Sequence, residues 1–153
     1  MRGALVLFSL FLFATTASAE PNTLVTEGYD QKKMDEAIAK AKKSVDKFIK
    51  ILESGEGEDF AVKAPIKDGE KVEHFWITNI KFKDGKFIGR IGNDPGIVEN
   101  VTINQKWTVG KEDISDWMFM RDDKIHGNFT MRPLLKTLPE AQAKQLRALL
   151  ADP

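Results

Sequence analysis

The chain of 153 residues contains no cysteine, and this absence narrows its chemistry considerably. Disulfides, thiol nucleophiles and cysteine-ligated metals are excluded at once. Histidine is scarce too, because only His74 and His126 occur, and neither has a spacing typical of zinc sites. We therefore expect no metal, no cofactor and no catalytic motif, and a fold held together by packing alone.

An excess of either charge is also missing. The 23 basic residues are balanced by 23 acidic ones, whereas proteins that bind nucleic acids usually carry a basic excess or a basic stripe. The lysine-rich stretch 40–50 shares its predicted helix with Asp35, Glu36 and Asp46 and is interpreted as a solvated helix face. Nucleic acid is therefore not an expected partner.

The one long apolar run lies at the N-terminus, where residues 4–14 follow the basic Arg2. A run of ~11 residues suits a signal peptide and falls short of the ~20 that a membrane-spanning helix needs. Ala17 and Ala19 form a small-x-small cleavage site. We predict a cleaved signal peptide over residues 1–19, a single domain over 20–153, and a periplasmic or secreted location. The alternative is an uncleaved membrane anchor.

Hydrophobic periodicity predicts an α+β fold. Residues 30–52 carry apolar side chains at steps of three and four, as in an amphipathic helix, and from Phe60 onward the period changes to two. Strands are predicted at 60–66, 72–82, 86–91, 101–109, 116–121 and 125–131, and a short C-terminal helix within 137–150. The N-terminal helix is expected to pack on a curved antiparallel sheet of about six strands, which could be barrel-like.

The stretch VEHFWITNI, residues 72–80, places Glu73 directly beside His74. On a strand, consecutive side chains point to opposite faces, so these two cannot converge on one metal or substrate atom unless a bulge intervenes. Both faces are apolar in the middle of the stretch, which predicts a central strand covered on both sides. The residues predicted to share one face are Val72, His74, Trp76, Thr78, Ile80 and Phe82.

Several polar and aromatic residues are candidates for a ligand site. His74 is either a general base or ligand beside Trp76, or a hydrogen-bonded histidine at the margin of the core. A catalytic His74 needs a carboxylate, and Asp94 and Asp116 are the candidates, although Asp116 could instead accept backbone N–H bonds. Arg132 suits an anion by its bidentate geometry or forms a salt bridge. The candidate ligand-binding residues are His74, Trp76, Asn93, Asp94, Asp116, Trp117 and Arg132.

Four segments, in this order, resemble the YegJ-like family of small bacterial proteins, which is a domain of unknown function. They are EHFWITNI (73–80), GRIGNDP (89–95), ISDWMFM (114–120) and GNFTMRPLL (127–135). The resemblance spans roughly residues 34–135. It implies a bacterial source, and hence periplasmic export, but it supplies no activity. Where the family often has G-G-Y-T before the arginine, this chain has Phe129, so a role for a tyrosine hydroxyl there is lost.

The predicted function is that of an exported, non-enzymatic module that binds a small ligand or a periplasmic protein. The alternative is a small hydrolase in which His74 works with an acidic partner such as Asp116. A third hypothesis is a stress-related or inhibitory protein that presents a surface rather than a pocket. None of the three involves a stable membrane anchor after the leader is removed.

Overall fold

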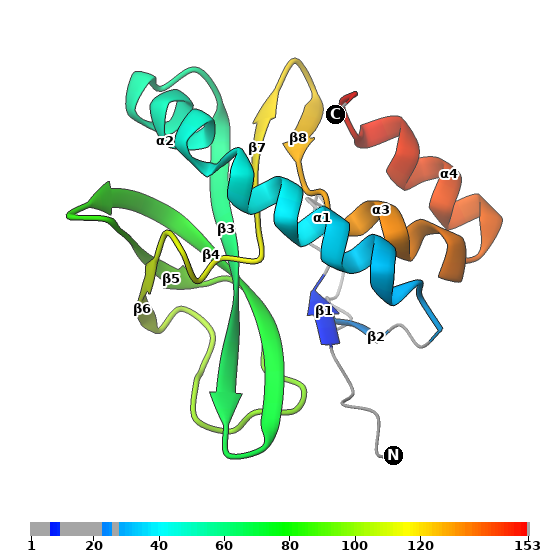
Figure 1. The fold of residues 1–153 in the computed structure, drawn as a ribbon, viewed down its shortest axis with the longest axis horizontal. Coiled ribbons are helices and arrows are strands. Elements are labelled where there is room, and N and C mark those ends of the chain that lie inside the picture. The colour runs from blue at the N-terminus through cyan, green and yellow to red at the C-terminus, as the bar shows by residue number, and fades with distance from the viewer. Residues whose placement is uncertain (1–6, 10–22, 26–27, 153) are drawn as a thin grey trace.

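The computed structural model describes residues 7–9, 23–25 and 28–152, and within this part the chain forms an α+β fold (Figure 1). The helices are α1 (Gln31–Lys43), α2 (Val45–Ser54), α3 (Met131–Leu134), the 3-10 helix η1 (Leu135–Thr137) and α4 (Glu140–Leu149). The strands are β1 (Leu7–Ser9), β2 (Thr23–Val25), β3 (Glu58–Asp68), β4 (Lys71–Lys83), β5 (Lys86–Ile91), β6 (Lys106–Gly110), β7 (Asp116–Arg121) and β8 (Lys124–Gly127).

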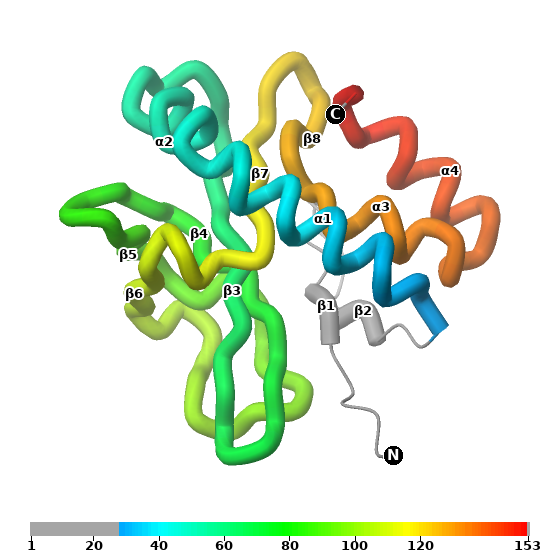
Figure 2. The backbone as a smooth tube through the Cα atoms, in the orientation of Figure 1, coloured from blue at the N-terminus to red at the C-terminus, as the bar shows by residue number. Residues whose placement is uncertain are grey.

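The six strands from β3 onward form an antiparallel sheet in the order β6-β5-β4-β3-β7-β8. The sheet does not close, so the barrel-like form that the sequence left open is absent from the described part of the chain. Figure 2 shows the β3–β4 hairpin extending to a tip well away from the helices.

Two short strands lie within or just after the predicted leader. β1 pairs in parallel with β4 at Glu73 and His74, and in antiparallel fashion with β2. Most of the predicted signal peptide, including its cleavage site after Ala19, lies outside the described residues. Among the helices that the structure describes, none is both long and apolar enough to cross a membrane.

The predicted helix over 30–52 is divided in two at Ser44. The Ser44 hydroxyl donates to the carbonyls of Lys40 (2.7 Å) and Ala41 (3.2 Å). Serine that bonds back to the preceding turn commonly bends a helix, and here it separates α1 from α2. Asp30 caps α1, because its carboxylate accepts from the Lys33 backbone N–H at 3.2 Å.

Helices cover both faces of the sheet. The face toward α1 and α2 is lined by aromatic and branched side chains, and Phe48 stacks on Trp117 with ring centroids 5.0 Å apart. The opposite face carries Trp76 and Met118, which pack against Leu146 of α4. The doubly covered central strand predicted for residues 72–82 is therefore confirmed as β4.

Three details of the strand prediction are wrong, each where a residue takes a left-handed backbone conformation. Asn79 (φ 50°) lies in a bulge of β4, so Ile80 joins the opposite core from Trp76. Asn104 (φ 64°) turns the chain, and the strand predicted from residue 101 begins only at 106. Gly127 (φ 78°) ends β8, so the strand predicted to 131 is replaced by α3.

Candidate functional site

A row of side chains crosses the three central strands on the face covered by α4. Strand register places Lys63 of β3 opposite Trp76 of β4 on one side and opposite Asp116 of β7 on the other. The Lys63 ammonium lies 4.5 Å from the centroid of the Trp76 ring. All three side chains are buried, with exposed fractions of 0% for Lys63 and Asp116 and 1% for Trp76.

Asp116 fastens β7 to the segment that follows β8. Its carboxylate accepts backbone N–H bonds from Trp117 (2.8 Å), Phe129 (3.1 Å) and Thr130 (2.8 Å), and the Thr130 hydroxyl donates to it at 2.6 Å. The turn at Gly127 and Asn128 brings these donors to the carboxylate. Of the two roles considered for Asp116, acceptance of backbone N–H bonds is the one that the structure places there.

The buried charges of this row alter each other's proton affinity. Burial lowers the pKa of Lys63 to about 8, against the opposing effect of Asp116. Burial likewise raises the pKa of Asp116, while Lys63 and the hydrogen bonds from Thr130 and Trp117 oppose that rise. Lys63 also donates to the Thr130 hydroxyl at 2.8 Å. The row is a buried, hydrogen-bonded network that rigidifies this face when its donors and acceptors are paired.

His74 is in hydrogen-bond contact with Ser115. Its Nδ1 lies 2.9 Å from the Ser115 hydroxyl, and Ser115 is only 4% exposed. Burial, and next the charge of Lys63, lower the pKa of His74 to about 4. Such a histidine is neutral near pH 7 and is a weak proton acceptor, which agrees better with a hydrogen-bonded position at the core margin than with a general base.

The other residues singled out from the sequence are dispersed. Asn93 is buried and accepts the Trp76 backbone N–H at 3.0 Å, whereas the neighbouring Asp94 is exposed. Trp117 points to the opposite face, where its indole N–H donates to the Ala41 carbonyl at 3.1 Å. The described contacts therefore do not gather these side chains, His74 and Asp116 around one pocket.

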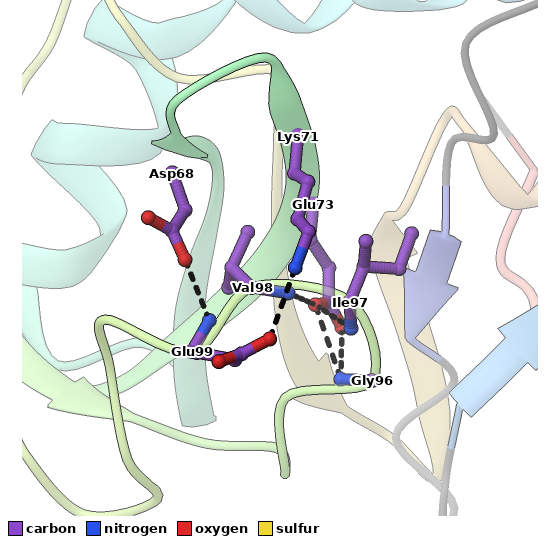
Figure 3. A network of polar contacts seen from close by, with 7 residues as sticks. All are labelled: Asp68, Lys71, Glu73, Gly96, Ile97, Val98 and Glu99. Carbon is purple, nitrogen blue, oxygen red and sulfur yellow. Dashed lines mark hydrogen bonds and ion pairs between the residues drawn. The ribbon is translucent and has the colours of Figure 1, made fainter.

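Glu73, near the start of β4, anchors the loop at residues 96–98 (Figure 3). Its carboxylate is 1% exposed and accepts backbone N–H bonds from Gly96 (3.0 Å), Ile97 (2.9 Å) and Val98 (3.2 Å). The nearby pair of Lys71 and Glu99, 3.0 Å apart, is solvent-exposed. Glu73 and His74 thus serve different contacts on opposite faces, as strand alternation predicted.

Arg132 borders an open cavity. The cavity has a volume of about 480 Å³ and lies between α1 and the segment from Phe129 through η1. One Arg132 Nη donates to the Ala151 carbonyl at 2.9 Å, while its Nε is buried without a partner among the described residues. None of the ion pairs within the described part of the chain includes Arg132, so the alternative of a salt bridge is not seen there.

The cavity combines an apolar floor with a basic rim. Its residues are Gly28, Tyr29, Asp30, Lys33, Glu36, Ala37, Lys40, Phe129, Arg132, Pro133, Lys136 and Thr137. Four cations therefore face two carboxylates, and both carboxylates are engaged on α1: Asp30 lies 3.7 Å from Lys33, and Glu36 lies 4.0 Å from Lys32. The rim consequently has positive charge that is available to an anion.

The sequence alone did not identify Lys63, Ser115 or the cavity. Lys63 occupies an ordinary polar position in an alternating strand, and its burial follows from α4 covering that face. The cavity residues come from two segments that are distant in sequence, around Lys40 and around Arg132. The packing of Met34 of α1 on Leu134 of α3 helps to bring these segments together.

Comparisons with known proteins extend over most of the chain. Residues 31–150 match the family described as "Uncharacterized protein conserved in bacteria", DUF2314. The chain is 50% identical over 151 residues to the Escherichia coli (strain K12) "Uncharacterized protein YegJ", covering 98% of this chain and 99% of that protein. It is also 40% identical over 90 residues, 55% of this chain and 35% of the other, to a Neisseria meningitidis "Putative ankyrin repeat protein". No solved structure matches.

Proposed function

The chain belongs to the bacterial family DUF2314, and we propose that it acts as a non-enzymatic periplasmic binding module whose ligand site is the cavity between α1 and the segment 129–137. The observation that carries this proposal is the cavity itself. Its volume of about 480 Å³ falls within the range of small-molecule sites. The Arg132 guanidinium at its edge also lies on a rim that Lys40 and Lys136 share.

Periplasmic residence rests on the predicted leader. An N-terminal basic residue, a short apolar run and a small-x-small site at Ala17–Ala19 together support export. Expression of the full chain in a bacterium, followed by cell fractionation and mass measurement, tests this part. A periplasmic product that begins at Glu20 is expected, and a full-length cytoplasmic product would contradict it.

Ligand binding is tested by a thermal-shift screen of small anions with the mature protein. A ligand at 100 times its Kd stabilises the folded state by about 2.7 kcal/mol, which raises the melting temperature measurably. Lys40→Glu/Lys136→Glu reverses charge at two exposed positions on the rim and is expected to abolish the shift. The matched control, Lys43→Glu/Lys144→Glu, reverses two exposed lysines that do not line the cavity and should leave the shift intact.

A hydrolase is the second candidate, because Ser115 and His74 lie at the distance of a nucleophile and its base. The burial of Ser115 and the lowered pKa of His74 argue against it. Treatment of the folded protein with a fluorophosphonate reagent, which modifies reactive serines, decides the question. We expect no adduct, and an adduct lost in both Ser115→Ala and His74→Ala would establish the hydrolase instead.

A further inference from the structure

The cavity between α1 and the segment 129–137 combines positive charges with apolar surfaces. This inference rests on the function proposed above and names the class of its ligand. Lys40, Arg132 and Lys136 supply positive charge at the rim. Tyr29 and Phe129 supply rings, and the Lys40 ammonium lies 5.4 Å from the centroid of the Phe129 ring.

The apolar floor continues into the core. Phe129 is 7% exposed and packs edge-on against Trp117, with ring centroids 5.2 Å apart. Ala37, 9% exposed, adds a small side chain from α1. A ligand that entered the cavity would therefore cover the apolar edges that Phe129 and Ala37 leave exposed, and burial of apolar surface favours association.

The charged edge of the cavity is suited to one anionic group. Arg132 is held by its bond to the Ala151 carbonyl, so its guanidinium has a fixed orientation. A guanidinium can bind a carboxylate or sulfonate through two parallel N–H bonds, which a lysine cannot reproduce. A small anion without an apolar part would make no contact with the apolar floor, and a neutral ligand would gain no electrostatic attraction from the basic rim.

We propose that the cavity binds an anionic amphiphile, meaning a small molecule with an apolar body and one carboxylate or sulfonate head. The body lies against Phe129 and Ala37, and the head lies between Lys40, Arg132 and Lys136. The source of such a molecule, a free organic acid or a fragment of a larger lipid, is a separate question that the same assay addresses with different competitors.

The test uses the fluorescent sulfonate 8-anilinonaphthalene-1-sulfonate with the folded mature protein. Saturable binding at one site is expected, and displacement is measured with three matched competitors: octanoate, octanol and acetate. Octanoate has both tail and head, octanol lacks the charge and acetate lacks the tail. Octanoate is expected to displace the probe at a concentration at least about tenfold lower than either of the others, because charge-assisted hydrogen bonds and apolar burial both contribute.

Amino-acid substitutions test whether the probe and its competitors bind in the cavity. Arg132→Lys retains the charge but not the two-pronged geometry, and it should weaken octanoate about tenfold. Lys43→Glu should have no effect, and near-ultraviolet circular dichroism confirms that each variant is folded. Equal displacement by octanol would overturn the inference, as would equal displacement by acetate, although the latter leaves a simple anion site and hence the proposed function intact. A probe that binds regardless of Lys40→Glu/Lys136→Glu overturns both.

Discussion

The two faces of the sheet bury different kinds of side chain. The face under α1 and α2 is an aromatic core in which Phe48, Trp117 and Phe119 stack, with centroids 5.0–6.4 Å apart. The face under α4 contains the buried polar row of Lys63 and Asp116. An apolar core tolerates change in proportion to the volume lost, whereas a buried polar network fails sharply when one partner is removed. We infer from this difference that the polar face holds its loops by specific hydrogen bonds.

The largest expected loss of stability comes from disrupting the hydrogen bonds of the polar face. Asp116→Ala removes the acceptor for three backbone N–H groups and the negative charge that Asp116 places near Lys63. We expect a loss of about 3–5 kcal/mol in the free energy of unfolding, measured by urea denaturation. The double variant Asp116→Ala/Lys63→Met should recover part of this loss, because the buried cation is removed together with the carboxylate that favours its charged form.

Phe48→Ala provides the matched comparison on the aromatic face. It should cost a similar ~3–5 kcal/mol through cavity formation, but no second substitution on that face should restore it by removing a charge. If the losses from Asp116→Ala and Lys63→Met simply add, the two side chains are not coupled and the described network is not a unit.

Acid provides the next test of the polar face. The pKa of His74 is about 4 in the folded chain, against an ordinary value of 6.5 for histidine. Between these values the unfolded chain binds a proton that the folded chain does not, so stability falls as the pH decreases from 6.5 to 4. The expected contribution is roughly 3 kcal/mol at most, and His74→Gln should remove it. Phe48→Leu should lower stability at every pH without changing the slope.

The alkaline side should show the corresponding behaviour of Lys63. Its pKa of about 8 lies below the ordinary lysine value of 10.5, so the unfolded chain holds the proton more strongly between these values. The expected direction is a rise in unfolding free energy from pH 8 to 10.5, of the same order as the His74 effect or smaller because Asp116 loses its cation. Lys63→Met should abolish this rise, and persistence of the rise would assign it to other groups.

A smaller effect is expected at the loop anchor of β4. Glu73→Gln weakens the bonds to the N–H groups of Gly96, Ile97 and Val98, at a cost of about 1–3 kcal/mol. Amide hydrogen exchange should accelerate at these three positions before it does elsewhere. The exposed neighbour Lys71→Ala should cost less than about 1 kcal/mol. Equal effects from the two substitutions would mean that burial of the Glu73 carboxylate contributes nothing.

The sequence predicted the regular parts of this molecule better than the points where the chain turns. Periodicity identified the amphipathic helix and the doubly covered β4, because alternation reports directly on which side chains are buried. It could not detect the left-handed conformations at Asn79, Asn104 and Gly127, because the alternation of apolar and polar residues does not report the backbone dihedral angles of single residues. Those three residues account for the errors in strand boundaries and faces.

The candidate site was predicted only in part. Arg132 was selected for its ability to bind anions, and it does border the cavity. His74 and Asp116 were selected as reactive groups, but each is engaged in a hydrogen bond that positions structure. A single sequence does not indicate that α1 packs beside α3, and hence does not associate Lys40 with Arg132.

The most direct test of a ligand site between α1 and the segment 129–137 is a titration of ¹⁵N-labelled protein with octanoate, followed by backbone amide chemical shifts. The saturable shift changes are expected to cluster at residues 29–40 and 129–137, which line the cavity. Changes centred on His74 and Ser115 would place the site at the polar face instead. An absence of saturable changes would contradict a ligand site in this cavity for anionic amphiphiles.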